Sequence, residues 1–227
     1  MKDTAAIIVA GGKGLRFGGD IRKQYLLLNR RPILWWSLSA FERCPSIESI
    51  TLVVPGEDVR RVNAQARAWK FRKLAAVVPG GVSRADSVRQ GLQHIPQNSR
   101  YVAVHDAVRP LVTPVLIENV IRQTRKTKAA LAACPSKDTV KIADARGCVA
   151  SSPSRDRVWL AQTPQIFERH VLERAHRQGR HWPVTDDAQL VERLGIRVKL
   201  VESSSENIKV TVPIDLIMAR KILEARA

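Results

Sequence analysis

The residues best suited to chemistry lie in one short stretch, residues 5–23. It begins with small and β-branched residues at positions 5–10, a pattern typical of a buried parallel strand. Glycine backbone can approach a ligand closely, and lysine and arginine supply charge that attracts an anion. Glycines crowd positions 11–19, and four cations stand in the same stretch: Lys13, Arg16, Arg22 and Lys23. The stretch therefore predicts a binding site for a polyphosphate.

Two familiar phosphate-binding motifs do not fit these residues. A Walker A loop requires serine or threonine after the Gly-Lys pair, whereas Lys13 is followed by Gly14. The dinucleotide fingerprint requires a third glycine three residues after the second, and Phe17 occupies that place. For the glycines taken alone, a flexible surface turn remains the alternative interpretation.

The composition indicates one globular domain. With 227 residues, 44% of them apolar, the chain can bury a sizeable core, so we expect a single domain over residues 1–227. No apolar run approaches the roughly 18 residues that a membrane-spanning helix needs, and glycines interrupt the first run too early for a signal peptide. Three cysteines without metal-site spacing predict reduced thiols. These features predict a cytoplasmic protein with no membrane partner.

The net charge of +17 raises nucleic-acid binding as an alternative. The cations, however, are spread along the whole chain, and no zinc-finger, heptad or aromatic RNA-binding motif accompanies them. A basic surface that attracts small anionic substrates explains the same charge. We therefore expect small-molecule substrates, and nucleic acid is the less favoured partner.

Strand and helix patterns alternate along the chain with a period of about 25 residues. This alternation predicts an α/β fold, Rossmann-like, in which helices cover both faces of a mostly parallel sheet. Ligands of such sheets bind beyond the carboxyl ends of the strands. Polar and glycine clusters follow three of the predicted strands, so we expect them to meet at one rim: residues 11–23, 80–87 and 106–109.

Residues 137–159 break the alternation. Positions 139–142 alternate polar and apolar side chains, positions 144–147 resemble a turn, and positions 148–150 could form the returning strand of a hairpin. This pattern predicts a β-hairpin. A lone hairpin is only marginally stable, so it must either cover its own domain or reach a second subunit. Beyond it, the pattern predicts a helix over about residues 167–178.

Nine short motifs occur in the order of a known enzyme family. They are residues 10–16, 23–25, 80–81, 85–87, 105–110, 138–139, 162–165, 185–188 and 207–211. On these residues, almost the whole chain resembles the 2-C-methyl-D-erythritol 4-phosphate cytidylyltransferases of the non-mevalonate isoprenoid pathway. Ribitol-5-phosphate cytidylyltransferases share many of the motifs and remain an alternative. Residues 138–141 and 185–188 look more like the methylerythritol enzymes.

The resemblance implies a nucleotidyltransferase fold and the transfer of CMP from CTP to a sugar-alcohol phosphate. A phosphate oxygen of the acceptor would attack the α-phosphorus in line, with no enzyme nucleophile. Catalysis would then rest on positioning and charge stabilisation. The resemblance also implies Mg²⁺ carried with CTP. It further implies a homodimer in which the arm formed by residues 137–159 reaches the partner's site. A non-catalytic nucleic-acid-binding protein is the alternative of a different class.

The resemblance also assigns individual residues. The implied catalytic residues are Arg16, Lys23, Arg155 and Lys209, with Arg157 as the alternative to Arg155. The implied nucleotide site comprises Ala10, Gly11, Gly12, Gly14, Arg16, Lys23, Gly81, Val82, Ser87 and Asp106, and Asp106 would also lie beside the magnesium. The implied acceptor site comprises Asp106, Arg109, Thr139, Arg155, Thr163, Thr185 and Lys209. Relatives commonly carry an acidic pair where this chain has Val82-Ser83, which leaves cytidine preference open there.

Overall fold

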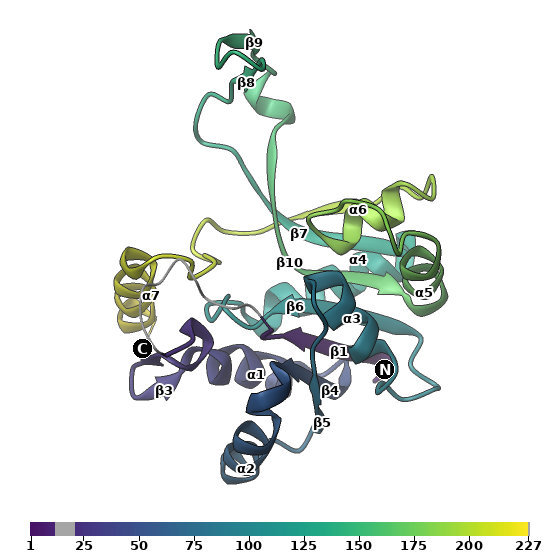
Figure 1. Ribbon diagram of the computed structural model, residues 1–227, viewed down its shortest axis with the longest axis vertical. Coiled ribbons are helices and arrows are strands. Elements are labelled where there is room, and N and C mark those ends of the chain that lie inside the picture. The colour runs from purple at the N-terminus through teal and green to yellow at the C-terminus, as the bar shows by residue number, and fades with distance from the viewer. Residues whose placement is uncertain (12–20, 227) are drawn as a thin grey trace.

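A seven-stranded sheet forms the centre of the computed structural model, which describes residues 1–11 and 21–226. The strand order is β11-β7-β10-β6-β1-β4-β5 (Figure 1). Parallel pairing joins β1 to β4 and β6, β4 to β5, and β7 to β11, whereas β10 is antiparallel to both neighbours. The strands are β1 (Thr4–Val9), β4 (Ile47–Val54), β5 (Leu74–Pro79), β6 (Tyr101–Asp106), β7 (Ala129–Pro135), β10 (Trp159–Glu168) and β11 (Lys199–Glu202). The predicted mostly parallel α/β sheet is confirmed.

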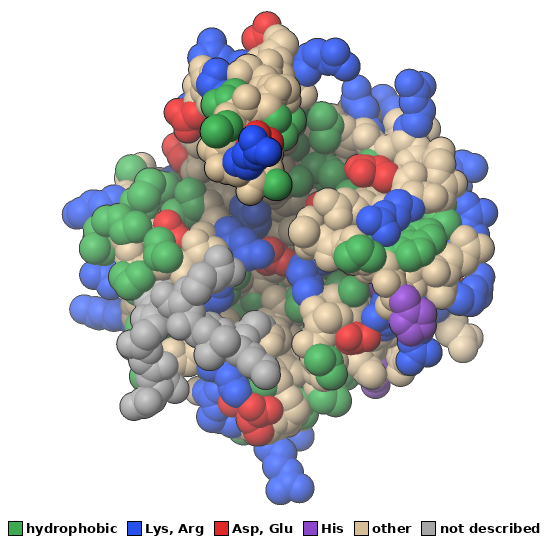
Figure 2. Space-filling model, turned by 45° about the horizontal axis from the view of Figure 1, so that its top comes forward, with side chains coloured by type: hydrophobic (Ala, Val, Ile, Leu, Met, Phe, Trp, Pro, Cys, Tyr) green, Lys and Arg blue, Asp and Glu red, His purple; other side chains and the backbone are tan. Residues whose placement is uncertain are grey.

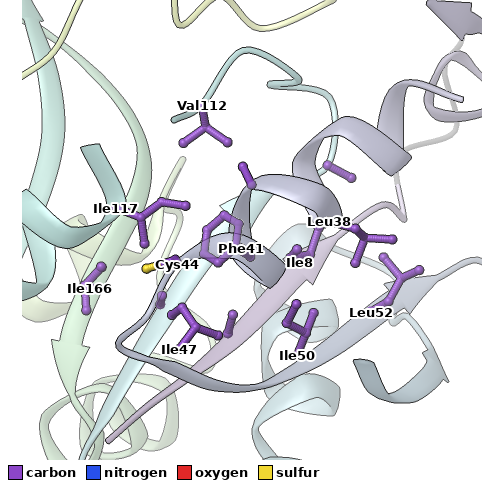
Figure 3. Close-up of a cluster of buried hydrophobic side chains, with 14 of the residues drawn as sticks. Ile8, Leu38, Phe41, Cys44, Ile47, Ile50, Leu52, Val112, Ile117 and Ile166 are labelled. Atoms are coloured by element: carbon purple, nitrogen blue, oxygen red, sulfur yellow. The ribbon is translucent and has the colours of Figure 1, made fainter. Parts of the chain in front are cut away.

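Helices cover both faces of this sheet. They are α1 (Ile33–Arg43), α2 (Val59–Trp69), α3 (Arg84–Leu92), α4 (Pro114–Thr127), α5 (Arg169–Gln178), α6 (Asp187–Glu192) and α7 (Pro213–Ala225). Strand β1 shows which helices cover each face, because alternate side chains of a strand point to opposite faces of the sheet. Ala6 and Ile8 pack with apolar residues of α1, α2 and α4 (Figure 3), whereas Ala5 and Ile7 pack with those of α3, α5 and α6.

Two helix starts follow directly from local sequence. Ser83 forms a capping box at α3, in which its Oγ accepts from the Asp86 N–H at 3.0 Å and its own N–H donates to Asp86 at 3.1 Å. At α4, the Thr113 hydroxyl accepts from the Leu116 N–H, and Pro114 occupies the first helical position. Both caps have the residue types and spacing that such helix starts require. They end the loops after β5 and β6 at defined points, so the loop lengths at that edge are set locally.

Strand β10 was not predicted, and the predicted helix over residues 167–178 begins only at Arg169. The strand carries polar residues in its buried part, which hides the usual apolar pattern. Tertiary partners satisfy those polar groups: the Gln165 amide donates to Asp186 at 2.8 Å, and Asn207 donates to Gln162 at 2.9 Å. Buried polar groups are stable when they are hydrogen-bonded, but a sequence pattern does not show the partner.

A small two-stranded sheet lies beyond the ends of β7 and β10, at the top of Figure 1. It pairs β8 (Ile142–Ala143) with β9 (Val149–Ser151) in antiparallel fashion. Asp144 orders the turn by accepting the backbone N–H groups of Arg146 and Cys148, both at 2.9 Å. Residues 141–150 are all exposed. The strands are shorter than the sequence pattern suggested.

Three 3₁₀ turns and a second short hairpin are the other elements of the described residues. The turns are η2 (Lys23–Tyr25), η3 (Gly56–Asp58) and η4 (Arg155–Arg157), and the hairpin pairs β2 (Leu27–Leu28) with β3 (Arg31–Pro32). Within the residues that the structure describes, no helix is both long and apolar enough to cross a membrane.

Candidate active site

A cavity of about 680 Å³ opens at the carboxyl ends of β1, β4, β5 and β6. Figure 2 shows a hollow at the centre of this face, with lysine, arginine and acidic side chains within it. The predicted rim is confirmed in its main parts, because each of the three segments contributes to the wall. The lining includes Ala10, Gly11, Lys23, Gly80, Gly81, Val82, Arg84, Ser87, Asp106 and Lys209.

The loop after β5 folds tightly onto the start of α3. The buried Ser87 hydroxyl accepts from the Gly81 N–H at 3.2 Å and donates to the Ser83 carbonyl at 3.0 Å. A Cβ placed on Gly81 would lie 2.2 Å from the Asp86 Cβ, so the close approach requires glycine. The Val82 side chain is fully exposed and apolar, which means that polar contacts at this position must come from its backbone.

Asp106, at the end of β6, lies between cations. Its Oδ2 is 2.7 Å from the Lys209 Nζ, and its Oδ1 accepts from the Arg84 Nε at 3.0 Å. Burial by itself raises the pKa of Asp106, but the charges of Arg84, Lys209 and Arg109 outweigh it and hold this pKa far below the usual range. The carboxylate is therefore ionised at neutral pH. It offers the cavity a fixed negative charge among positive ones.

Arg84 is the important residue that sequence reasoning missed. Its guanidinium bridges Asp106 and Asp187, donating to the latter at 2.6 Å, and Asp187 also lies 2.9 Å from the His176 Nε2. Burial lowers the pKa of Arg84, but the two carboxylates raise it by more than burial lowers it, so the pKa is raised overall. This chain of contacts ties β6, α3, α5 and α6 together beneath the cavity.

Two signals in the sequence could have identified this bridge. An arginine in the first turn of a helix is opposed by the helix dipole, so Arg84 calls for acidic partners. In the motif of residues 185–188, the cap is Asp186, which accepts from the Gln189 N–H at 3.0 Å. Asp187 is then available for another contact, and it is almost completely buried. A buried aspartate next to a capping aspartate indicates a charged partner.

Thr163 and His105 form a support behind Asp106. The Asp106 N–H donates to the Thr163 Oγ1 at 3.1 Å, and this hydroxyl lies 2.9 Å from the His105 Nδ1. Burial lowers the pKa of His105 to about 3, so the ring is neutral and packed. Asn207 donates to the Thr163 carbonyl at 3.0 Å, and Arg109 donates to the Asn207 carbonyl at 2.8 Å.

The remaining residues of the implied acceptor site lie outside the cavity wall. Arg109 is largely buried behind Asp106, and burial lowers its pKa. Thr185 lines a separate cavity of about 390 Å³, which also has Arg84 in its wall. Thr139 and Arg155 are exposed near the β8–β9 hairpin, as is Arg157, so the geometry does not choose between the two arginines. Gly12, Gly14 and Arg16 lie outside the described residues.

The oxygen atoms available at the cavity suit a metal ion that is bound partly by the substrate. Among residues 1–11 and 21–226, no group of three or more histidine, cysteine or acidic side chains could hold a metal ion. Magnesium, however, is usually bound by one or two carboxylates together with substrate phosphates. Asp106 is an ionised carboxylate at the cavity wall, and it fits that arrangement.

Comparisons with known proteins give one consistent result. Residues 4–225 match the family model described as 2-C-methyl-D-erythritol 4-phosphate cytidylyltransferase, IspD. A protein of that name from Desulforamulus reducens is 43% identical, covering 100% of this chain and 98% of the relative, and one from Alkaliphilus oremlandii is 41% identical over 98% and 96%. The crystal structure of 4-diphosphocytidyl-2C-methyl-D-erythritol synthase from Anaerococcus prevotii superposes with a TM-score of 0.87 at 33% identity, covering 98% of this chain and 99% of that one. The Thermus thermophilus cytidylyltransferase gives 0.77 at 30% identity with full coverage of both chains.

Proposed function

This chain belongs to the 2-C-methyl-D-erythritol 4-phosphate cytidylyltransferase family, and we propose that the cavity at the carboxyl ends of β1, β5 and β6 is its active site. The enzyme transfers CMP from CTP to 2-C-methyl-D-erythritol 4-phosphate, giving 4-diphosphocytidyl-2-C-methyl-D-erythritol and pyrophosphate. The observation that most supports this location is the ionised Asp106 held between Lys209 and Arg84, in a cavity that Gly11, Gly80 and Gly81 also line.

The nucleotide occupies the part of the cavity between the two glycine-rich loops. Ala10, Gly11 and Lys23 line this part of the cavity, and Lys23 neutralises charge of the triphosphate. The family resemblance also assigns the triphosphate to Gly12, Gly14 and Arg16, which lie outside the described residues. Gly81 and Val82 meet the cytosine through backbone groups, since neither has a polar side chain. Ser87 holds that loop in shape through the contact with the Gly81 N–H. Asp106 and the substrate phosphates would hold magnesium, which would supply further neutralisation of charge.

The acceptor lies beside Asp106 and Lys209. The Lys209 ammonium and the Arg155 guanidinium orient the acceptor phosphate so that one of its oxygens faces the α-phosphorus in line. No proton has to be removed from that oxygen, which agrees with a neutral, packed His105. Catalysis then consists of orienting two anions and stabilising the charge of the transition state. Thr163 and Arg109 act by supporting the backbone of Asp106 and Asn207.

Residues 137–159 form an arm of the single catalytic domain, and this arm completes the site of a second copy. Within one chain Thr139 and Arg155 are exposed, and neither lines the cavity. The arm region also exposes apolar side chains that an interface would cover, with exposed fractions of 52% for Ile142, 62% for Val149 and 54% for Leu160. The homodimer works in the cytoplasm, where its substrate CTP is available.

The first experiment measures pyrophosphate release from CTP and magnesium. Methylerythritol 4-phosphate and ribitol 5-phosphate serve as parallel acceptors, and ATP, GTP and UTP serve as nucleotide controls. We expect release only with CTP and the methylerythritol acceptor. Release with ribitol 5-phosphate alone would contradict the acceptor assignment. Release with neither acceptor would make salt-sensitive nucleic-acid binding the next property to measure.

The variant Gly81→Ala tests the nucleotide loop. Its new methyl group would collide with the Asp86 Cβ, so the loop must move away from α3. Overpacking of this kind costs about 1–3 kcal/mol, which corresponds to an increase of about 5- to 150-fold in the KM for CTP. The KM for the acceptor should remain nearly unchanged. Gly195→Ala, at a φ of +75° and outside the cavity lining, is the control for backbone strain, and it should leave both KM values alone.

A further inference from the structure

Asp58, at the end of η3, receives an unusual number of hydrogen bonds for one carboxylate. Its Oδ2 accepts from the Arg22 Nη1 at 2.5 Å and from the Tyr25 hydroxyl at 2.9 Å, and its Oδ1 accepts from the Arg61 Nη2 at 2.9 Å. Burial raises the pKa of Asp58, but these partners outweigh it and lower the pKa below its usual value. Asp58 is therefore a charged centre that gathers three side chains.

Two of those side chains flank Lys23 in the chain. Arg22 precedes Lys23, Tyr25 follows it by two residues, and the Tyr25 N–H donates to the Arg22 carbonyl at 2.9 Å. Arg61 also stacks over the Tyr25 ring, with its guanidinium carbon 4.1 Å from the ring centroid. The contacts of Asp58 thus hold both ends of the turn that contains Lys23.

The residue between Lys23 and Tyr25 is held from the other direction. Gln24 is buried, and its amide donates to the Ala10 carbonyl at 2.7 Å, just beyond the end of β1. A 3₁₀ turn of three residues is too short to be stable alone, and no side chain caps η2. Its orientation must therefore come from tertiary contacts, which include Asp58 on one side, the end of β1 on the other, and the packing of Tyr25 against the core cluster that contains α1.

We propose that Asp58 is a positioning residue for Lys23. It fixes the η2 turn so that Lys23 lines the cavity where the triphosphate is proposed to bind, whereas Asp58 itself does not line that cavity. This inference rests on the role proposed above for Lys23. It adds a function for the loop after β4, which none of the recognised motifs includes.

The test is a double-mutant cycle of Asp58→Asn and Lys23→Ala. Small displacements of a positioned group cost up to about 100-fold, so we expect Asp58→Asn to lower kcat/KM for CTP by about 10- to 100-fold. In the Lys23→Ala background, the same substitution should have almost no further effect, since the group that it positions is gone. Tyr25→Phe keeps the Asp58 charge and removes one hydrogen bond. It should show a smaller loss that is also absent without Lys23.

Asp3→Asn is the matched control. Asp3 and Asp58 have the same side-chain exposure, 12%, and each is paired with arginine, Asp3 with Arg125 at 2.7 Å. Asp3 does not line the cavity, so its variant should lose some thermal stability and keep its kcat/KM. Equal losses of activity in the two variants would show that Asp58 acts only through stability, and would overturn the proposal.

The cycle also separates this proposal from the proposed function. Additive effects of Asp58→Asn and Lys23→Ala would overturn the positioning role while leaving Lys23 in the site. An unchanged kcat/KM in Lys23→Ala would overturn both roles. If neither acceptor supported turnover, the proposed function would be contradicted. Dissociation constants for CTP, measured by calorimetry on the same variants, would still show whether Asp58 and Lys23 are coupled. Non-additive losses of CTP affinity in the two variants would support the positioning role of Asp58, and additive losses would exclude it.

Discussion

Lys209→Ala is expected to lower kcat/KM by about two to three orders of magnitude, which is the usual loss when one group that stabilises transition-state charge is removed. The Lys209 ammonium lies 2.7 Å from Asp106 and lines the cavity where the two phosphates are proposed to meet. Its removal takes away a cation and also leaves Asp106 with less compensation for its charge. Steady-state kinetics with CTP and acceptor varied in turn will show whether kcat or KM changes.

Lys221→Ala is the control for this prediction. Lys221 lies on α7 and pairs with Glu224 at 2.8 Å, but it is well exposed and does not line the cavity. An exposed pair of this kind contributes little, so we expect wild-type kinetics. If Lys209→Ala behaved like Lys221→Ala, the cavity around Asp106 would not be the catalytic site.

Arg84→Leu is expected to have the largest effect on stability. It leaves two acidic side chains without their shared cation, and Asp106 and Asp187 are 7% and 1% exposed. Removing one partner of a buried ion pair usually costs about 3–5 kcal/mol. For a protein of this size, that corresponds to a decrease in Tm on the order of 10 °C. Thermal unfolding at neutral pH measures it directly.

The stability loss should depend on pH in a defined direction. In the wild type burial raises the pKa of Asp187, but Arg84 and His176 together outweigh burial and lower this pKa, so the contribution of Asp187 to stability is present above about pH 4 and fades on acidification. In Arg84→Leu, burial dominates and raises this pKa above that of the unfolded chain. The carboxylate then destabilises the fold at neutral pH, and protonation relieves the penalty. The difference in unfolding free energy should therefore shrink as the pH falls toward 4.

Arg125→Leu provides the comparison for both measurements. Arg125 has a side-chain exposure of 32%, close to the 26% of Arg84, and it pairs with a single carboxylate, Asp3. We expect a loss of about 1 kcal/mol, in the range of peripheral ion pairs, and no effect on the kinetics. A loss in Arg84→Leu that was equally small, or that did not change with pH, would contradict the bridging role.

The sequence predicted the parallel part of the fold because the signals there are local. Each strand from β1 to β7 within the main sheet is predominantly apolar, and the caps at Ser83 and Thr113 mark the helices that follow. The carboxyl ends of parallel strands lie at one edge by geometry alone. For this reason the predicted rim already contained Gly11, Gly81 and Asp106, and all three line the cavity.

The sequence by itself thus determined the sheet edge, the glycine loops and the charged residues at the strand ends, since these depend on short-range patterns. Tertiary structure alone decided the placement of β10, whose polar residues are stabilised by Asn207 and Asp186, which are distant in the chain. It also decided the partners of Arg84 and Asp58. The ion pair between α3 and α6, and the one between Arg22, just before η2, and Asp58 of η3, form only when packing brings these segments together. The periodicity of the sequence does not show which charges will pair.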